Sequence, residues 1–138
     1  RIAEDGEGAT KLFQVIVENA PSLNDARILS KAVVSSNLTK AAVFGNDANC
    51  GRILCAMGYS GAEFEPDKTD IQFESVNGTI TLVENGLLID FNEEKAIKVL
   101  SADEVTARID VKCGSSTATA WGCDLTHEYV SINADYRS

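Results

Sequence analysis

The sequence predicts an α+β fold of mixed α/β layers that includes a β-meander. Three observations favour this class: an almost continuous apolar run over 11–18, apolar residues at helical spacing over about 22–35, and apolar residues that alternate with polar ones after residue 61. The chain has 138 residues, of which 44% are hydrophobic and 24% charged, a composition that is typical of one globular domain and excludes intrinsic disorder. We expect a single domain over 1–138, with a candidate sub-boundary near 60–66.

In the first half of the chain we expect two strands and two helices. The run over 11–18 is typical of a strand that is covered on both faces. A capped helix follows from about 22 to 35, and a second short buried strand is predicted at 41–44. The polar residues 46–49 predict a turn, and apolar residues at helical spacing predict a short helix over 50–58.

The middle of the chain predicts tight hairpins. Asn-Gly pairs at 77–78 and 85–86 separate three short runs of alternating apolar residues. Such pairs tolerate the positive φ that a two-residue hairpin turn requires, so they predict a three-stranded β-meander. A helix is predicted over 93–100, with Asn92 as its cap.

The last part of the chain predicts one more hairpin and one more helix. Strands at 105–111 and 118–121 are expected to pair with each other around a Gly-Ser-Ser turn. A final helix is expected to begin after Asp124, because apolar residues that include Tyr129 recur there at helical spacing.

Charge and hydropathy exclude two classes of partner. The chain carries 12 Lys and Arg against 21 Asp and Glu, a net charge of −9, whereas a nucleic-acid-binding surface is basic. Residues 62–94 hold most of the excess negative charge; we interpret them as a solvated face, with a cation site as the alternative. No apolar stretch approaches the ~20 residues that span a bilayer, and residues 1–10 lack the features of a signal peptide. We therefore expect no nucleic acid, no membrane and a cytoplasmic location.

The cysteines and the histidine form no recognisable catalytic or metal-binding pattern. The spacing of Cys50, Cys55, Cys113 and Cys123 matches no zinc ribbon and no Cys-x-x-Cys redox pair, so we interpret them as thiols of a reducing cytosol. The single histidine, His127, accompanies no serine nucleophile elbow and is interpreted as a surface residue. We expect no metal and no cofactor.

Three polar segments stand out between the apolar elements. Residues 6–8 place Glu7 between two glycines, where a carboxylate can meet a ligand ammonium group; a surface turn is the alternative. Residues 44–52 hold more small polar side chains than a turn needs, which predicts a hydrogen-bonded network that is either structural or lines a ligand site. Residues 133–138 form another dense polar cluster at the end of the chain.

These segments resemble the ornithine acetyltransferase / glutamate N-acetyltransferase family of arginine biosynthesis. They occur in the family's order along the whole chain, and together they are very specific. The matching motifs are Asp5-Gly6-Glu7-Gly8-Ala9-Thr10-Lys11, Phe44-Gly45-Asn46-Asp47-Ala48-Asn49, Gly51-Arg52-Ile53, Ala120-Trp121-Gly122-Cys123-Asp124-Leu125-Thr126, Tyr129-Val130 and Ile132-Asn133-Ala134-Asp135-Tyr136-Arg137.

The resemblance implies an enzyme that cleaves itself before a threonine and uses the freed threonine as its nucleophile. The acetyl group of N-acetylornithine passes to that threonine and then to glutamate, and some members of the family also accept acetyl-CoA. It also implies an α chain from the same precursor as a partner and a heterotetramer of two chain pairs. This chemistry is coherent, because an α-amine with a pKa near 8 has a neutral form that can accept the hydroxyl proton.

By resemblance, three residues of this chain contact the substrate. Glu7 matches a substrate-binding glutamate, and Asn133 and Ser138 match contacts at the family's C-terminus. A carboxylate for an ammonium group and neutral donors for a carboxylate suit an amino-acid ligand. The chain departs from the family where Cys50 replaces a usual Trp and where Ser138 replaces a usual Thr.

No catalytic residue of the family falls within this chain, because the nucleophilic threonine and the oxyanion-stabilising residues lie upstream of the segment that matches Arg1. The start at Arg1 rather than Met indicates either a processing site or a cut within a longer protein. We therefore expect the C-terminal portion of the enzyme's second (β) chain, inactive alone and part of the family's two-chain self-processing fold. The alternatives are a non-catalytic amino-acid-binding α+β module and a purely structural interaction domain.

Overall fold

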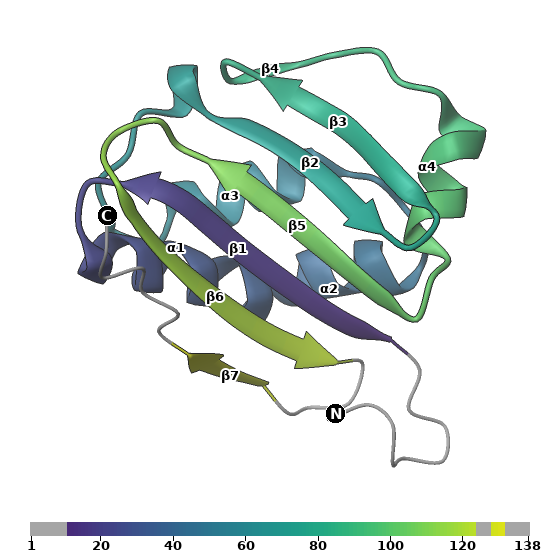
Figure 1. The fold of residues 1–138 in the computed structure, drawn as a ribbon, viewed down its shortest axis with the longest axis horizontal. Coiled ribbons are helices and arrows are strands. Elements are labelled where there is room, and N and C mark those ends of the chain that lie inside the picture. The colour runs from purple at the N-terminus through teal and green to yellow at the C-terminus, as the bar shows by residue number, and fades with distance from the viewer. Residues whose placement is uncertain (1–10, 124–127, 132–138) are drawn as a thin grey trace.

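One mixed sheet forms the framework of the computed structural model, which describes residues 11–123 and 128–131 (Figure 1). Within these residues the sheet has seven strands in the order β4-β3-β2-β5-β1-β6-β7. Strand β1 runs parallel to β5 and antiparallel to β6, so its apolar run is paired on both edges. The strands are β1 (Leu12–Ala20), β2 (Asp70–Ser75), β3 (Gly78–Glu84), β4 (Leu87–Leu88), β5 (Glu104–Asp110), β6 (Ser116–Cys123) and β7 (Glu128–Ser131).

Each described α-helix follows a residue whose side chain accepts a hydrogen bond from a backbone N–H of the first turn. Ser22, Ser36, Asn49 and Asn92 supply these caps, which satisfy amides that a helix leaves without a partner. Helix α1 packs on β1 and β6, and α4 packs on β2 and β3. In Figure 1, α1, α2 and α3 lie together on one side of the sheet. The helices are α1 (Leu23–Ser35), α2 (Asn37–Phe44), α3 (Cys50–Gly58) and α4 (Glu93–Leu100), with a short 3-10 helix, η2 (Pro66–Lys68).

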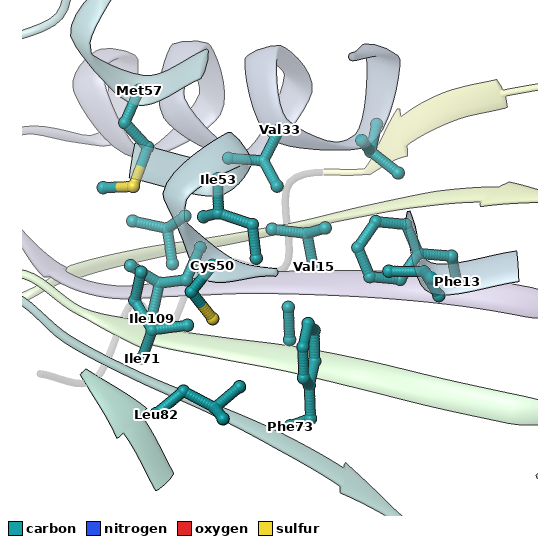
Figure 2. Close-up of a cluster of buried hydrophobic side chains, with 14 of the residues drawn as sticks. Phe13, Val15, Val33, Cys50, Ile53, Met57, Ile71, Phe73, Leu82 and Ile109 are labelled. Carbon is teal, nitrogen blue, oxygen red and sulfur yellow. The ribbon is translucent and has the colours of Figure 1, made fainter. Parts of the chain in front are cut away.

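The hydrophobic core lies between the sheet and these helices (Figure 2). Alternate residues of the strands supply one side of it, because successive side chains of a strand point to opposite faces. Phe13, Val15 and Val17 of β1 are fully buried, whereas the residues between them are half-buried on the other face. The core contains residues from both sides of 60–66. The division of the chain near 60–66 stays a prediction.

The predicted α+β class is confirmed, and so are the strand at 11–18, the helices near 22–35, 50–58 and 93–100, and the β-meander. The second hairpin turn is Asn85-Gly86, with φ of 49° and 78°, as the sequence predicts. The first turn differs by one residue. Ser75 pairs with Gly78, so Val76 and Asn77 form the turn.

The strand predicted at 41–44 is wrong, because these residues belong to helix α2. Ser36 begins a new helix directly after α1, and its side chain accepts a hydrogen bond from the Thr39 amide at 3.2 Å. A four-residue apolar run is equally compatible with a buried strand and with the buried side of a short helix. The cap upstream of the run decides between them.

The final hairpin is also wrong in its pairing, although both of its strands exist. Strands β5 and β6 lie on opposite edges of β1 and do not pair with each other. Residues 111–115 cross the end of β1, where the Val111 and Cys113 amides donate to the Glu18 and Asn19 carbonyls at 3.1 and 2.8 Å. Strand β1 is apolar on one face and needs a partner on each edge, so it separates two strands that are neighbours in sequence.

The last helix is wrong where the structure describes it. Residues 128–131 form strand β7, in which Tyr129 pairs with Trp121 of β6. The outer edge of β6 offers unpaired backbone groups, and a following segment satisfies them as a strand but not as a helix. The rest of the predicted helix, 124–127 and 132 onward, lies outside the described residues.

We predict that Gly114→Ala destabilises the fold strongly. A Cβ at Gly114 would lie 2.3 Å from the Ala20 carbonyl oxygen and 3.0 Å from the Pro21 Cα, so the crossing over β1 would have to shift. Urea unfolding followed by the fluorescence of Trp121 should show a loss of about 2 kcal/mol or more. Gly58→Ala is the matched control, because its Cβ would meet no atom within 4 Å. Equal stability of the two variants would contradict this role of Gly114.

We predict that Thr39→Val stabilises the protein. The Thr39 hydroxyl is buried and, among the described residues, has no hydrogen-bond partner. Valine has nearly the same shape and removes this cost, so the free energy of unfolding should rise by about 1 kcal/mol. Thr79→Val is the control on the exposed part of β3 and should change stability by less than about 0.5 kcal/mol. A loss of stability in Thr39→Val would show that the hydroxyl has a partner in solution.

Candidate functional site

Glu7, Asn133 and Ser138, the three predicted substrate contacts, lie outside the described residues. Their positions and their convergence stay predictions. The structure does describe where the segments that carry them join the sheet. Residue Leu12 begins β1, five residues after Glu7, and Ser131 ends β7, two residues before Asn133.

These two junctions lie on strands of one sheet with a single strand between them. Leu12 pairs with Cys123 of β6, and Ser131 pairs with Thr119 of β6, which is itself opposite Ile16 of β1. Ser131 is therefore displaced from Leu12 by two strand spacings across the sheet and by four residues along it. Standard sheet dimensions make this separation about 16 Å.

Lys11 fixes the chain where the Glu7 segment enters the sheet. Its ammonium group is buried and donates to the Val43 carbonyl at 3.1 Å, the Leu100 carbonyl at 2.7 Å and the Asn46 side-chain oxygen at 2.5 Å. Val43 and Leu100 lie in the last turns of α2 and α4. Carbonyl groups at helix C-termini lack helical partners and carry partial negative charge, so they suit an ammonium ion. Lys11 thus ties the start of β1 to two helices.

The polar segment 44–52 forms the structural network that was one of its two interpretations. Asn46, with a positive φ of 60°, accepts from Lys11. Asn49 caps α3 by accepting from the Gly51 amide at 3.1 Å. The Asp47 amide donates to the Ala42 carbonyl at 2.7 Å, which closes α2. These hydrogen bonds of Asn46 and Asn49 therefore hold Lys11 and the start of α3 in place.

A cleft of about 780 Å³ lies beside the start of β1. One of its walls is the loop between α4 and β5, where the Asp103 carbonyl accepts a hydrogen bond from the Leu12 amide at 2.8 Å. The opposite wall is the turn between β2 and β3. The lining residues are Glu74, Ser75, Val76, Asn77, Ser101, Ala102, Asp103, Glu104 and Thr106. Three carboxylates make the cleft acidic.

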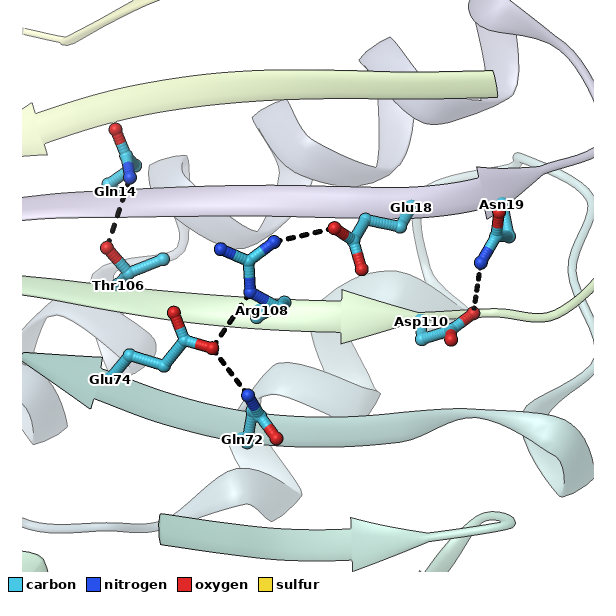
Figure 3. Close-up of polar contacts among 8 residues, drawn as sticks. All are labelled: Gln14, Glu18, Asn19, Gln72, Glu74, Thr106, Arg108 and Asp110. Atoms are coloured by element: carbon cyan, nitrogen blue, oxygen red, sulfur yellow. Dashed lines mark hydrogen bonds and ion pairs between the residues drawn. The ribbon is translucent and has the colours of Figure 1, made fainter. Parts of the chain in front are cut away.

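The sheet face opposite α1, α2 and α3 carries separate groups of polar contacts, the largest of which is a network around Arg108 (Figure 3). Arg108 is at its centre: its Nε donates to Glu74 at 2.8 Å, and a terminal nitrogen donates to Glu18 at 2.6 Å. Gln14 links three strands, because it accepts from the Trp121 indole at 2.7 Å and donates to Thr106 at 3.1 Å. These groups are partly buried and already paired with one another.

The network changes the acidity of its members. Burial tends to raise the pKa of Glu74, but hydrogen bonds from Arg108 and Gln72 and the Arg108 charge outweigh it, so the pKa lies below its usual value. The hydrogen bond to Glu74, opposed by burial and aided by the charge of Glu18, raises the pKa of Arg108. Both groups are therefore ionised at neutral pH. The two charges form an ion pair with each other.

The described cysteines differ in their burial. Burial raises the pKa of the Cys50 thiol to about 12, so this side chain is a neutral part of the core, as Figure 2 shows. Cys55 and Cys113 are free thiols. Cys123 is buried in β6. His127 lies outside the described residues.

The described part of the chain contains neither a candidate metal site nor a helix that could cross a membrane. No group of three or more His, Cys, Asp and Glu side chains there could hold a metal ion. Among its helices, none has the length and apolar character needed to cross a membrane.

A family model matches the whole chain, residues 1–138, and its description is ArgJ family. The chain belongs to the ArgJ family. Its similarity to curated members is high: it is 54% identical over 138 residues to the arginine biosynthesis bifunctional protein ArgJ of Thermotoga neapolitana. It is 53% identical over 137 residues to the protein of the same name from Caldanaerobacter subterraneus subsp. tengcongensis. All of this chain aligns with the first relative and 99% with the second.

A solved ArgJ structure shares the fold. The arginine biosynthesis bifunctional protein ArgJ from Bacillus halodurans matches with a TM-score of 0.79 and 42% sequence identity, over 91% of this chain and 58% of that chain. The chain spans about a third of the length of the curated relatives, 35% and 34% respectively. It corresponds to part of an ArgJ protein.

Sequence reasoning missed the roles of Lys11 and Arg108. The sequence identifies Lys11 only as the last residue of a motif, although a lysine at the start of a strand with one buried apolar face signals a buried ammonium that needs acceptors. Arg108 alternates with Ala107 and Ile109 in β5, which places it on the polar face. Its partners Glu18 and Glu74 are distant in sequence, so no local pattern could identify them.

We predict that Glu74→Gln reduces the acid sensitivity of folding. The pKa of Glu74 is lower in the folded than in the unfolded chain, so its stabilising contribution is complete above the unfolded pKa and is lost as the pH falls through the folded one. Urea unfolding at pH 7 and at pH 3 should show a smaller loss of stability in the variant than in the parent. Glu84→Gln, an exposed carboxylate on β3, is the control. An unchanged pH dependence in Glu74→Gln would contradict the prediction.

Proposed function

We propose that this chain is the C-terminal portion of an acetyltransferase that moves an acetyl group from N-acetylornithine to glutamate in arginine biosynthesis. The observation that carries the proposal is the match to the ArgJ family over the whole chain. It is supported by relatives with about half of their aligned residues identical, each named an arginine biosynthesis bifunctional protein. The proposed location is the cytoplasm.

We further propose that the substrate's ammonium group binds Glu7 and that its carboxylate binds Asn133 and Ser138. The geometry of the sheet is compatible with this convergence. Leu12 and Ser131 are about 16 Å apart by strand spacing. The five residues from Leu12 to Glu7 and the two from Ser131 to Asn133 span at most about 24 Å together when extended. The two segments are therefore long enough to meet at one amino acid.

The nucleophile of the proposed reaction is a threonine of the upstream portion, freed by self-cleavage. Its hydroxyl attacks the acetyl carbonyl of N-acetylornithine while its own α-amine takes the hydroxyl proton, and ornithine leaves with a proton on its amine. The amine of glutamate then attacks the acetyl-threonine ester and releases the threonine. Acetyl-CoA is a second donor under the same proposal. The α chain of the precursor is the proposed partner, in a heterotetramer of two chain pairs.

In this division of labour the present chain binds and orients substrate. The Lys11 junction and the β6–β7 pairing hold Leu12 and Ser131, which lie next to the two proposed substrate-binding segments in the sequence, within one sheet. Orientation of this kind accounts for a large part of many enzymatic rate accelerations. The chain by itself supplies no nucleophile and is expected to be inactive.

The test uses the complete gene product that contains this chain, with N-acetylornithine and glutamate as substrates. We expect acetyl transfer with ping-pong kinetics, and no transfer by the 138-residue chain alone. Glu7→Ala and Asn133→Ala should each lower kcat/KM at least tenfold, because each leaves a charged end of the substrate without its partner. Glu63→Ala, a surface carboxylate far from both segments in sequence, is the control. Unchanged kinetics in both site variants would favour a structural role, and ornithine binding without transfer by the complete protein would favour a binding module.

A further inference from the structure

We propose that Lys11 is a positioning residue for substrate binding: its ammonium group holds the Glu7 segment in place by joining the C-termini of α2 and α4. The inference deepens the proposed function and rests on it, because Glu7 is its assumed point of action. Lys11 itself has no assigned contact with substrate.

The contacts of Lys11 make it a fixed point of the chain. An ammonium ion has three donors, and three oxygens accept from this one, at 2.5, 2.7 and 3.1 Å. The acceptors come from residues 32, 35 and 89 positions away in sequence. No local turn could supply these acceptors, so the position of Lys11 depends on how two separate helices, α2 and α4, pack.

The backbone next to Lys11 is fixed as well. The Leu12 amide donates to the Asp103 carbonyl at 2.8 Å, and β1 then pairs with β5 and β6. Leu100 ends α4, and Asp103 lies three residues later, just before β5. The side chain of Lys11 and the backbone of Leu12 therefore donate hydrogen bonds to one stretch of chain, at its residues 100 and 103.

Because these hydrogen bonds fix the position of Lys11, they limit the distance from Lys11 at which Glu7 can lie. Four residues separate Glu7 from Lys11, so their Cα atoms are at most about 14 Å apart. A carboxylate that binds an ammonium group needs a distance of about 2.8 Å, and an error of 1 Å in such a contact weakens binding and orientation. Loosening the junction would increase the volume that Glu7 explores and lower its share of productive positions.

The contact is more specific than a general stabilising interaction. Asn46 has a positive φ of 60° and presents its side-chain oxygen to Lys11, within a loop whose other asparagine, Asn49, caps α3. A helix C-terminus needs no lysine from a distant strand, because water or a C-cap satisfies its carbonyls. Two helix ends converge here on one side chain.

The experiment measures Lys11→Met in the complete gene product. Methionine retains the apolar stem and removes the ammonium group, so the tether is lost with little change in volume. We expect KM for N-acetylornithine to rise at least tenfold and the Kd of ornithine, measured by calorimetry, to rise in parallel. We expect kcat to stay within about threefold, because the upstream nucleophile is unaffected.

A double-mutant cycle separates positioning from ordinary stabilisation. If Lys11 acts through Glu7, Lys11→Met has less than a twofold further effect on KM and Kd when Glu7 is already alanine. If the two substitutions instead raise KM and Kd by factors that multiply in the double variant, the proposal is overturned. Ser22→Ala, which removes the cap of α1 far from Lys11, should lower the Tm without changing KM.

The remaining outcomes are also decisive. A lower Tm with unchanged KM and Kd in Lys11→Met would make Lys11 merely structural. If that variant fails to fold, Asn46→Ala removes one of the three acceptors and should give a smaller rise in KM; no rise overturns the proposal. If the parent protein shows no acetyl transfer, the proposed function fails, and the ornithine Kd still decides the role of Lys11. Absence of both transfer and ornithine binding would overturn both proposals.

Discussion

A single buried ammonium group ties the sheet of this protein to its helical layer. Lys11 lies where β1 begins, and its three acceptors include carbonyls of the last turns of α2 and α4. A buried cation is costly unless strong acceptors surround it, and helix C-termini supply partial negative charge where an ammonium needs it. The residues that precede Lys11 in the sequence lie outside the described part of the chain. Those residues include Glu7, on which the proposed substrate binding depends.

The two faces of the sheet have different physical characters. One face is apolar and lies under α1, α2 and α3, where it forms the core. The other carries Arg108 between Glu18 and Glu74, together with the chain of hydrogen bonds from Trp121 through Gln14 to Thr106. Because these polar groups satisfy one another, the second face can lie in a partly desolvated environment without leaving charges unpaired. The chain covers about a third of its relatives' length, so such an environment fits a part of a larger protein.

Local patterns predicted most elements, because caps and alternation are encoded within a few residues. Ser22 and Asn92 begin helices where the sequence predicts them, and Asn85-Gly86 forms its predicted turn. The wrong pairing of the final hairpin and the wrong last helix share one cause, which is competition from distant parts of the chain. Strand β1 separates β5 from β6, and the free edge of β6 draws residues 128–131 into a strand. For the candidate site, the sequence predicts a hydrogen-bonded network over residues 44–52, either structural or lining a ligand site, but the contact of Asn46 with Lys11, 35 residues away, could not be inferred from spacing. The predicted contacts of Glu7, Asn133 and Ser138 came from family resemblance and stay predictions.

The central position of β1 has a consequence for biosynthesis. Its neighbours in the sheet, β5 and β6, are separated from it by about a hundred positions in sequence, since Leu12 pairs with both Glu104 and Cys123. A ribosome that adds roughly 5 to 20 residues per second needs about 5 to 20 s to deliver them after β1 emerges. During this interval the most apolar strand of the chain has neither edge covered. The nascent polypeptide is therefore exposed to chaperone capture and self-association until β5 and β6 have been translated.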